Sequence, residues 1–330
     1  MRALQDKSQL WDHGPVANCS IVILNWNGKH LLAESIPAVL AAVEFTGGGH
    51  EVIVVDNGSG DGSPDYVRHS FPSVKVVALA RNMRFSAGNN AGACAARREI
   101  LVFLNNDMVV ERDFLPPLLS HFDDPRVFAA TCRIVMPQVE LRGHRGRETG
   151  VTRGLYQGGF LSLRQEEEIP SKAVPVLYAG GGSCACDRAK FLALGGFDTL
   201  WDPFYWEDVD LSYRARKRGW EIVFEPRSVV HHKHRATNNP RNFPGNFIPL
   251  AEKKNSILFM WKNVSDRRIL LQHFRCLWRE LANPGSDPLL APAFFWALRQ
   301  LPQALARRLS EQAHWQLTDA EVLRRGNRVQ

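Results

Sequence analysis

The sequence predicts an α/β protein whose central sheet is mostly parallel and carries helices on both faces. Three observations predict this class: short runs of β-branched apolar residues, helical segments between these runs, and polar or glycine-rich turns where the runs end. The chain has 330 residues, which fits one large domain with an additional segment. Hydrophobic residues make up 45% and charged residues 23%, which excludes a disordered or fibrous protein.

In the first half of the chain, strand and helix patterns alternate. A helical pattern covers residues 31–44 and ends before three consecutive glycines. We expect Ser86 to cap a second helix, rich in small residues, that continues to Arg98. Four buried strands are expected at 20–24, 52–55, 74–79 and 100–104.

The second half begins with a segment of weak periodicity, 137–170, which is rich in glycine, arginine and glutamate and predicts a long loop or hairpin. Regular structure is expected again from residue 174. Helices are predicted at 187–194 and 207–218, the latter ending at Gly219. Strands are predicted at 221–224 and 228–230, and a helical pattern with a break at 283–285 follows residue 250.

The net charge is +7, and most of the excess lies near the C-terminus. Residues 261–330 contain 11 Lys and Arg but 6 Asp and Glu. This basic, aromatic-containing segment suits either contact with an anionic membrane surface or a solvated helical appendage, and the sequence leaves both open. No nucleic-acid-reading motif accompanies the charge, so we expect no nucleic-acid partner.

Membrane spans and disulfides are not expected. The longest uncharged apolar segment, Pro288 to Leu298, has eleven residues, and the first 18 residues lack an apolar signal core. The six cysteines form no CxxC pair or zinc-binding pattern, which predicts buried free thiols. We therefore expect a cytoplasmic protein, with peripheral attachment to the inner face of the cell membrane as an alternative.

Polar clusters follow three of the predicted strands, where parallel sheets bind their ligands. The carboxylate of Asp56 is placed to accept hydrogen bonds from a nucleobase or ribose, although an Asx turn is the alternative. Asp107, after Asn105 and Asn106, is a candidate for a hard divalent cation bridging two phosphates, although an ordinary polar turn is the alternative.

Three further clusters have both a chemical and a structural interpretation. Glu207, Asp208 and Asp210 at a helix start either cap that helix or supply a general base, because neighbouring carboxylates and the aromatic residues 204–206 favour protonation. The histidines of segment 231–234 are metal-ligand candidates or a basic turn. The glycines 180–182 permit close approach to a ligand or make a turn.

Taken in order, these segments resemble the family 2 glycosyltransferases, and within them the rhamnosyltransferase-like bacterial members. The resemblance covers about residues 19–263. It depends on the segments SIVILNWNG (20–28), VVDNGS (54–59), NMRFSAGNNAG (82–92), NND (105–107), FYWEDVDL (204–211) and EKKN (252–255).

The resemblance implies a GT-A fold and a domain organisation. Residues 19–135 would bind the nucleotide sugar and residues 136–263 the acceptor, preceded by an extension (1–18) and followed by a basic helical region (264–330). The implied activity is inverting transfer of a sugar, first rhamnose from dTDP-rhamnose and next a UDP-hexose. The implied acceptor is a hydroxyl of a saccharide or lipid-linked saccharide in cell-wall or surface-polysaccharide synthesis.

The resemblance also assigns roles to residues. Asp208 would be the general base and Glu207 would shape the acceptor site, while Asp107 and His232, with His231 as competitor, would hold Mg²⁺ or Mn²⁺. Asn105 stands where the family usually has an Asp, which removes one negative charge near the cation. The implied substrate-binding residues are Asn25, Asn27, Asp56, Asn82, Asn90, Asn105, Asn106, Gly181 and Trp206.

Three alternatives are weighed against this interpretation. A nucleotidyltransferase is disfavoured because the loop at 25–29 is poor in glycine, and a dehydrogenase because no G-x-G-x-x-G follows the first strand. A non-catalytic saccharide-binding protein on the same fold is disfavoured because Glu207 and Asp208 are both present.

Overall fold

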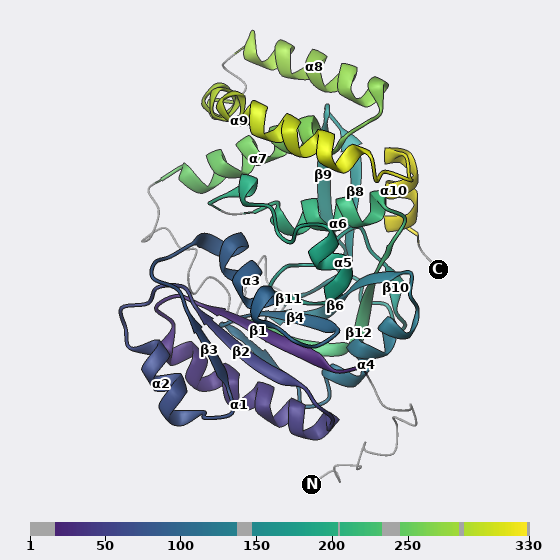
Figure 1. Cartoon of the computed structure of the whole chain (residues 1–330). Coiled ribbons are helices and arrows are strands. Elements are labelled where there is room, and N and C mark those ends of the chain that lie inside the picture. The colour runs from purple at the N-terminus through teal and green to yellow at the C-terminus, as the bar shows by residue number, and fades with distance from the viewer. Residues whose placement is uncertain (1–16, 137–146, 204, 233–244, 284–286, 329–330) are drawn as a thin grey trace.

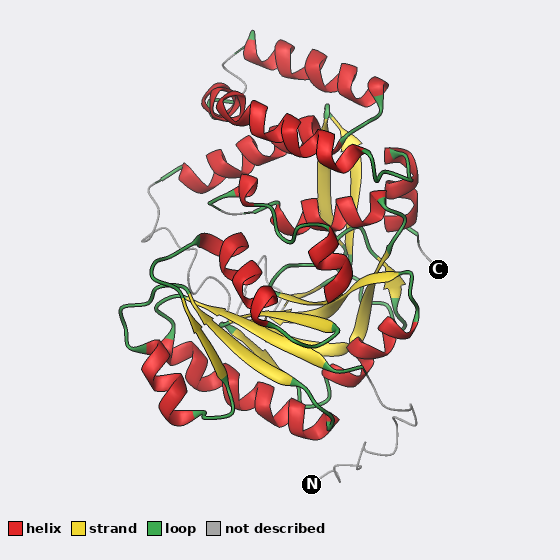
Figure 2. Ribbon diagram, viewed as in Figure 1, coloured by secondary structure: helices red, strands yellow, loops and turns green. Residues whose placement is uncertain are grey.

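The structure is a computed structural model that describes residues 17–136, 147–203, 205–232, 245–283 and 287–328. A central sheet separates two layers of helices, and a further stack of helices lies beyond one of them (Figures 1 and 2). The expected extension at 1–18 lies almost wholly outside the described residues, as does Phe204 and most of the predicted break at 283–285.

Four strands from the first part of the chain form a parallel half of the sheet. Its strands run in the order β4-β1-β2-β3, and each neighbouring pair is parallel. All four correspond to the strands predicted from the sequence: β1 (Cys19–Asn25), β2 (Glu51–Asp56), β3 (Lys75–Ala78) and β4 (Ile100–Asn105).

The other half of the sheet pairs mostly antiparallel. Strand β11 lies between β4 and β6 and is antiparallel to both, whereas β6 and β12 are parallel. The whole sheet is therefore mixed, and parallel pairing describes the first half best. Its remaining strands are β5 (Met108–Val110), β6 (Val127–Met136), β7 (Arg147–Thr149), β10 (Val174–Pro175), β11 (Ser183–Asp187) and β12 (Glu221–His232).

Alternate side chains of the central strands pack on opposite helical layers. Ile21 and Ile23 of β1 pack in one core with the layer of α1, α2 and α4, whereas Val22 packs in the other with α3, α5 and α6. The helical segments of these layers are α1 (Lys29–Thr46), α2 (Ser63–Ser70), α3 (Arg84–Ala95), α4 (Leu115–Leu119), η2 (Ser120–Asp123), α5 (Arg188–Ala193), η3 (Thr199–Trp201) and α6 (Glu207–Lys217).

Two local predictions need correction. Ser86 does not cap α3, because that helix begins at Arg84 and the buried Ser86 hydroxyl instead donates to the Asp198 carbonyl at 3.4 Å. The strands predicted at 221–224 and 228–230 form one strand, β12, whose register shifts between Glu225 and Val229.

The segment 137–170 is predicted to be a long loop or a hairpin, and its described part contains a hairpin. Strands β8 (Thr152–Gln157) and β9 (Phe160–Gln165) form a separate two-stranded sheet. Gly158 and Gly159 between them both have positive φ, which a two-residue hairpin turn of this kind requires. Residues 137–146 lie outside the described part.

Four helices form the C-terminal part, and the last returns to the α/β body. Asp319 on α10 accepts a hydrogen bond from the Tyr213 hydroxyl at 2.5 Å and pairs with Lys217 at 2.6 Å. Helix α10 is therefore packed against the α/β body rather than solvated. The domain boundary expected at residue 264 stays a prediction. The helices are α7 (Phe247–Asn263), α8 (Arg267–Leu281), α9 (Leu290–Gln312) and α10 (Asp319–Gly326).

No helix in the described ranges is long and apolar enough to span a bilayer. All six cysteines are free. Burial raises the pKa of the thiols of Cys19, Cys132, Cys184 and Cys186, as expected of buried free cysteines. The prediction is wrong for Cys94, which is exposed on α3.

Candidate functional site

The ends of β1, β2 and β4 are joined by buried side-chain amides. Asn25 and Asp56 are register partners, and the Asn25 amide donates to the Asp56 carboxylate at 3.2 Å. The amide of Asn106 donates in turn to the Asn25 oxygen at 2.8 Å. Three residues predicted to bind substrate therefore form one chain of hydrogen bonds along the sheet edge.

A second layer of contacts ties the loops outside this chain together. The Ser59 amide donates to Asp56 at 3.0 Å, and the Ser59 hydroxyl accepts from the Asn27 amide at 2.8 Å. The Asn27 side chain accepts from the Gly60 amide at 2.8 Å. The carboxylate of Asp56 is thus held in place by both loops, with one wall of the site formed by backbone groups.

Asn57 fixes the entry to α3, and the sequence did not single it out as a site residue. Its side chain donates to the Asn82 oxygen at 3.1 Å and accepts from the Met83 amide at 2.7 Å. Arg84, which has a φ of 67°, donates its amide to Asn82 at 2.8 Å. The predicted residue Asn82 therefore shapes this turn. The sequence signal that could have identified Asn57 is its place in the glycine-rich motif that follows Asp56.

Of the two histidine candidates, His232 lies beside Asp107 and His231 does not. The His232 imidazole lies 3.2 Å from the Asp107 carboxylate. His231 points to the other face of β12, where its imidazole meets Glu111 at 2.6 Å. The backbone explains the choice, because His232 is the register partner of Met108, the residue after Asp107.

This pair fits a divalent cation. The second carboxylate oxygen of Asp107 is buried and has no hydrogen-bond partner among the described residues, as expected of a ligand atom. Carboxylate oxygen and imidazole nitrogen are both donors that Mn²⁺ accepts. Within the described ranges no group of three or more His, Cys, Asp or Glu residues converges on one point. Phosphate and water are ligands that commonly complete the shell of such a cation.

The glycine turn before β11 connects the sheet edge to helix α6. The Asn105 amide donates to the Gly182 carbonyl at 3.0 Å. One residue earlier, the Gly181 amide donates to the Asp208 carboxylate at 3.2 Å. The predicted cation motif and the predicted base are therefore held to adjacent residues of one turn.

The residues before α6 have an unusual backbone. Tyr205 and Trp206 both have positive φ, 67° and 80°, which side-chain-bearing residues rarely adopt. The buried Asn255 of α7 holds this segment, because its amide donates to the carbonyls of Trp201 at 2.8 Å and Tyr205 at 2.9 Å. Strain of this kind persists where the surroundings enforce it and is concentrated at functional sites.

Burial raises the pKa of both carboxylates that begin α6. Burial, followed by the neighbouring charge of Asp208, raises the pKa of Glu207 to about 8. Burial also raises the pKa of Asp208, although the amides of Gly181 and Val209 donate to its carboxylate and oppose the rise. Asp208 remains half-buried, so of the two it is the side chain that a substrate can reach.

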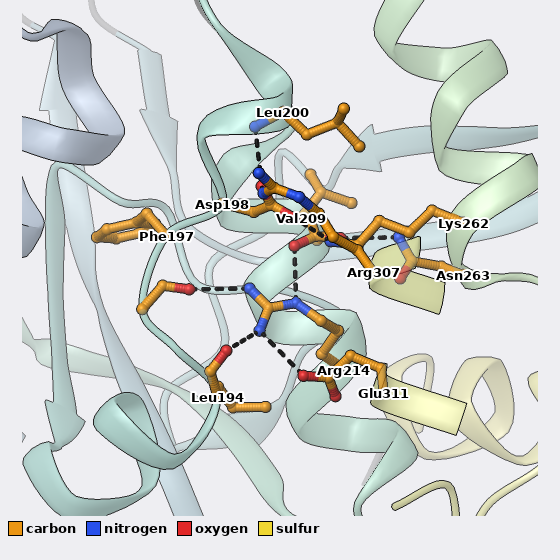
Figure 3. Close-up of polar contacts among 12 residues, drawn as sticks. Leu194, Phe197, Asp198, Leu200, Val209, Arg214, Lys262, Asn263, Arg307 and Glu311 are labelled. Carbon is orange, nitrogen blue, oxygen red and sulfur yellow. Dashed lines mark hydrogen bonds and ion pairs between the residues drawn. The ribbon is translucent and has the colours of Figure 1, made fainter. Parts of the chain in front are cut away.

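Asp210, two residues further on, has the opposite electrostatics because cations bind it; its partners Arg214, Lys262 and Asn263 are labelled in Figure 3. Its carboxylate pairs with Arg214 at 2.8 Å and with Lys262 at 2.6 Å, and accepts from Asn263 at 2.9 Å. Burial raises the pKa of Asp210, but these two cations outweigh it and lower that pKa to about 2. Asp198 extends the network by pairing with Lys262 at 2.7 Å.

The remaining predicted residues lie in separate places. The side-chain amide of Asn90 is engaged at both ends by the backbone of Phe197, at 2.8 and 2.9 Å, and so lies away from the amide chain. Trp206 immediately precedes α6, and its ring packs against Phe259 with centroids 5.1 Å apart. A cavity of 570 Å³ between α8 and α9 is lined by none of the predicted site residues.

Comparison with known proteins identifies the class. The sequence profile described as glycosyl transferase family 2 matches residues 20–191, which is slightly more than half of the chain. The chain therefore belongs to glycosyl transferase family 2.

Two curated relatives show the range of the similarity. The pre-mycofactocin glycosyltransferase of Mycobacterium tuberculosis is 32% identical over 189 residues, which cover 57% of this chain and 38% of that protein. N-acetylgalactosaminyltransferase 6 of Drosophila melanogaster is 28% identical over 226 residues, covering 64% and 33%. The chain thus spans about a third of the length of these relatives.

Two solved structures share the fold. One is GalNAc-T7 with UDP, GalNAc and Mn²⁺, with a TM-score of 0.58 and 18% identity over 76% of this chain and 48% of that chain. The other is the mannosyltransferase PcManGT from Pyrobaculum calidifontis with GDP-Man and Mn²⁺, with a TM-score of 0.52 and 15% identity over 92% and 88%. These similarities confirm the predicted GT-A fold with a C-terminal helical part.

Proposed function

We propose that this protein is an inverting glycosyltransferase that moves a sugar from a nucleoside diphosphate to an acceptor hydroxyl. Membership of family 2 and a fold shared with two transferases solved with nucleotides and Mn²⁺ support this activity. The subtype resemblance favours dTDP-rhamnose as donor and a UDP-hexose next. The acceptor of the proposal is a saccharide or lipid-linked saccharide, used at the inner face of the cell membrane.

One observation carries the proposal: a single glycine turn contacts both the segment proposed to bind the diphosphate and the proposed general base. Asn105, two residues before Asp107, binds Gly182, and Asp208 binds Gly181. A sugar seated beside this turn has the diphosphate-binding residues on one side and a carboxylate on the other. The turn packs tightly at this point, because a Cβ at Gly181 would lie 3.1 Å from the Phe85 ring.

The sheet edge supplies the nucleotide-binding groups of the proposal. Asp56 is held by Asn25 and Ser59 in one orientation, so its carboxylate is ready to accept hydrogen bonds from ribose or base hydroxyl and N–H groups. Asp107 and His232 would hold a divalent cation, which when bound neutralises negative charge on the diphosphate leaving group. Asn106, through Asn25, keeps the two binding elements in register.

Asp208 is the general base of the proposal. As the acceptor oxygen bonds to the anomeric carbon, its proton passes to the Asp208 carboxylate and the bond from that carbon to the diphosphate oxygen breaks. The electron pair of that bond leaves with the diphosphate. A single displacement of this kind inverts the configuration and needs one base. Glu207, which is buried next to Asp208 and has a raised pKa, would shape the acceptor site from behind that base.

The variant Asp208→Asn tests the chemistry. We expect transfer to fall by about 10²- to 10⁴-fold, the usual contribution of a general base, while the nucleotide sugar still raises the melting temperature. A thermal-shift panel of nucleotide sugars with Mn²⁺ selects the donor first. Asp65→Asn, at an exposed position on α2, is the matched control and should retain full activity. Near-normal turnover by Asp208→Asn would remove this residue as the base.

A further inference from the structure

Exposed apolar side chains are concentrated on two neighbouring helices. Eleven large hydrophobic residues of the described chain are exposed, and seven of them belong to α8 and α9. Both helices lie at the end of the molecule opposite α1 and α2 (Figure 1). The seven are Leu271, Phe274, Trp278, Phe295, Leu298, Leu305 and Leu309, and we call the surface they form the α8–α9 face.

Each helix presents these residues as one stripe. On α8 the exposed positions are separated by three and four residues, and on α9 by three, seven and four, which places each set on one side of its helix. Trp278 is 75% exposed and Leu309 70%, far above the usual exposure of such side chains. A stripe this exposed on each of two adjacent helices forms a contiguous patch rather than scattered surface residues.

The two stripes enclose a groove. A cavity of 570 Å³ lies between the helices and is lined by Phe274, Trp278, Leu298 and Leu305 among others. Its floor includes Trp261 of α7, and Arg308 is the one charged residue of its lining. That guanidinium is engaged, since it donates to the Val264 carbonyl at 2.6 Å. The groove is therefore apolar and of a size that takes a hydrocarbon chain.

Arginines border the apolar stripe of α8. Arg268, Arg275 and Arg279 are exposed and spaced by seven and four residues, which places them on one line next to Leu271 and Trp278. Helix α8 carries one acidic residue, Glu280, against four arginines. Exposed aromatic residues beside a row of arginines are typical of a helix that lies in the interface of an anionic membrane.

We propose that the α8–α9 face docks on the anionic phospholipid leaflet, with Phe274 and Trp278 in the headgroup and acyl boundary and the arginines on lipid phosphates. Charge favours lipid over a second copy of the chain, because a twofold contact through this face would bring together two rows of arginines with one Glu280 each. The proposal is narrower than attraction of the whole basic C-terminal segment, since α10 packs against α6 and takes no part. It is independent of the transfer activity.

Vesicle flotation of the full chain tests the proposal. We expect the protein to float with vesicles of phosphatidylglycerol and phosphatidylcholine and to float poorly with phosphatidylcholine alone. Phe274→Ala with Trp278→Ala should weaken binding at least tenfold at any salt concentration. Arg268→Gln with Arg275→Gln should weaken it by about fivefold per arginine at low salt, with a smaller effect at high salt.

Matched controls separate docking from general stickiness. Leu192→Ala removes an exposed apolar side chain on α5, and Arg97→Gln removes an exposed arginine; both should bind vesicles like the wild type. Thermal melting checks that every variant is folded. Failure of the wild type to float with anionic vesicles, or equal loss in the controls, would overturn the proposal. It would also be overturned if the paired aromatic variant dissociated a dimer in sedimentation while still binding vesicles.

Discussion

The edge of the parallel strands and the first turn of α6 stabilise their carboxylates by different means. At the sheet edge Asp56 is held by neutral groups, the amides of Asn25 and Ser59. At α6 three carboxylates lie within four residues, and the two cations Arg214 and Lys262 both bind the third, Asp210. The comparison teaches that the position of the cations separates Asp210, whose pKa is lowered, from Glu207 and Asp208, whose pKa is raised.

The separation follows from geometry on a helix. Asp210 and Arg214 are four residues apart and therefore adjacent on one face, which turns toward α7 and Lys262. Asp208 turns toward the glycine turn at Gly181 instead. Removing Asp210 and removing Asp208 should consequently have opposite kinds of effect, one on stability and one on activity.

The largest effect is expected for Asp210→Ala. This change removes the carboxylate that Arg214 and Lys262 share and leaves Lys262 with Asp198 alone. Breaking a buried pair in this way costs about 3–5 kcal/mol of unfolding free energy. Chemical denaturation measures it. Asp208→Ala, which removes a carboxylate whose burial is uncompensated by a cation, should leave the unfolding free energy unchanged or raise it. Equal destabilisation by both variants would break the comparison.

The next effect concerns the cation site. His232→Ala should weaken Mn²⁺ binding by about 10- to 100-fold, a range typical for loss of an interaction at a metal site, because His232 faces Asp107. His231→Ala is the matched control, since its imidazole binds Glu111 on the other face of β12. Mn²⁺ titration followed by calorimetry distinguishes them. Weakening by His231→Ala alone would reassign the ligand, and activity unchanged by a chelator would remove both Asp107 and His232.

Taken over a single pH unit, the smallest effect is the pH dependence of stability. The pKa of Glu207 is raised from 4.5 to about 8 by burial and by Asp208, so the folded protein holds a proton that the unfolded chain releases. Stability should therefore fall as pH rises between these two values, by up to about 1.4 kcal/mol per pH unit. Glu207→Gln should remove this part of the slope in thermal denaturation across pH 5–8. Glu44→Gln, at an exposed site on α1, is the control. An unaltered slope in Glu207→Gln would show that this carboxyl ionises normally.

Much of the site was predictable from local sequence because strand ends are local features. Asn25, Asp56 and Asn106 each follow a run of buried apolar residues, and parallel pairing brings such ends to one edge. The contacts of Asn90 were not predictable, because its partner Phe197 lies 107 residues away. The choice between His231 and His232 also needed the register of β12 with β5.

The sequence by itself determined the α/β class, the four parallel strands, the polar strand ends and the resemblance to family 2, because apolar periodicity and turn residues act over short distances. Tertiary structure alone decided that Asp210 is paired with buried cations while Glu207 and Asp208 are not. Lys262 lies 52 residues away in the chain and reaches Asp210 through the packing of α7. Tertiary structure also decided that α8 and α9 expose an apolar face beside arginines. Electrostatic partners and surface exposure depend on which elements pack together, and short-range patterns do not contain that information.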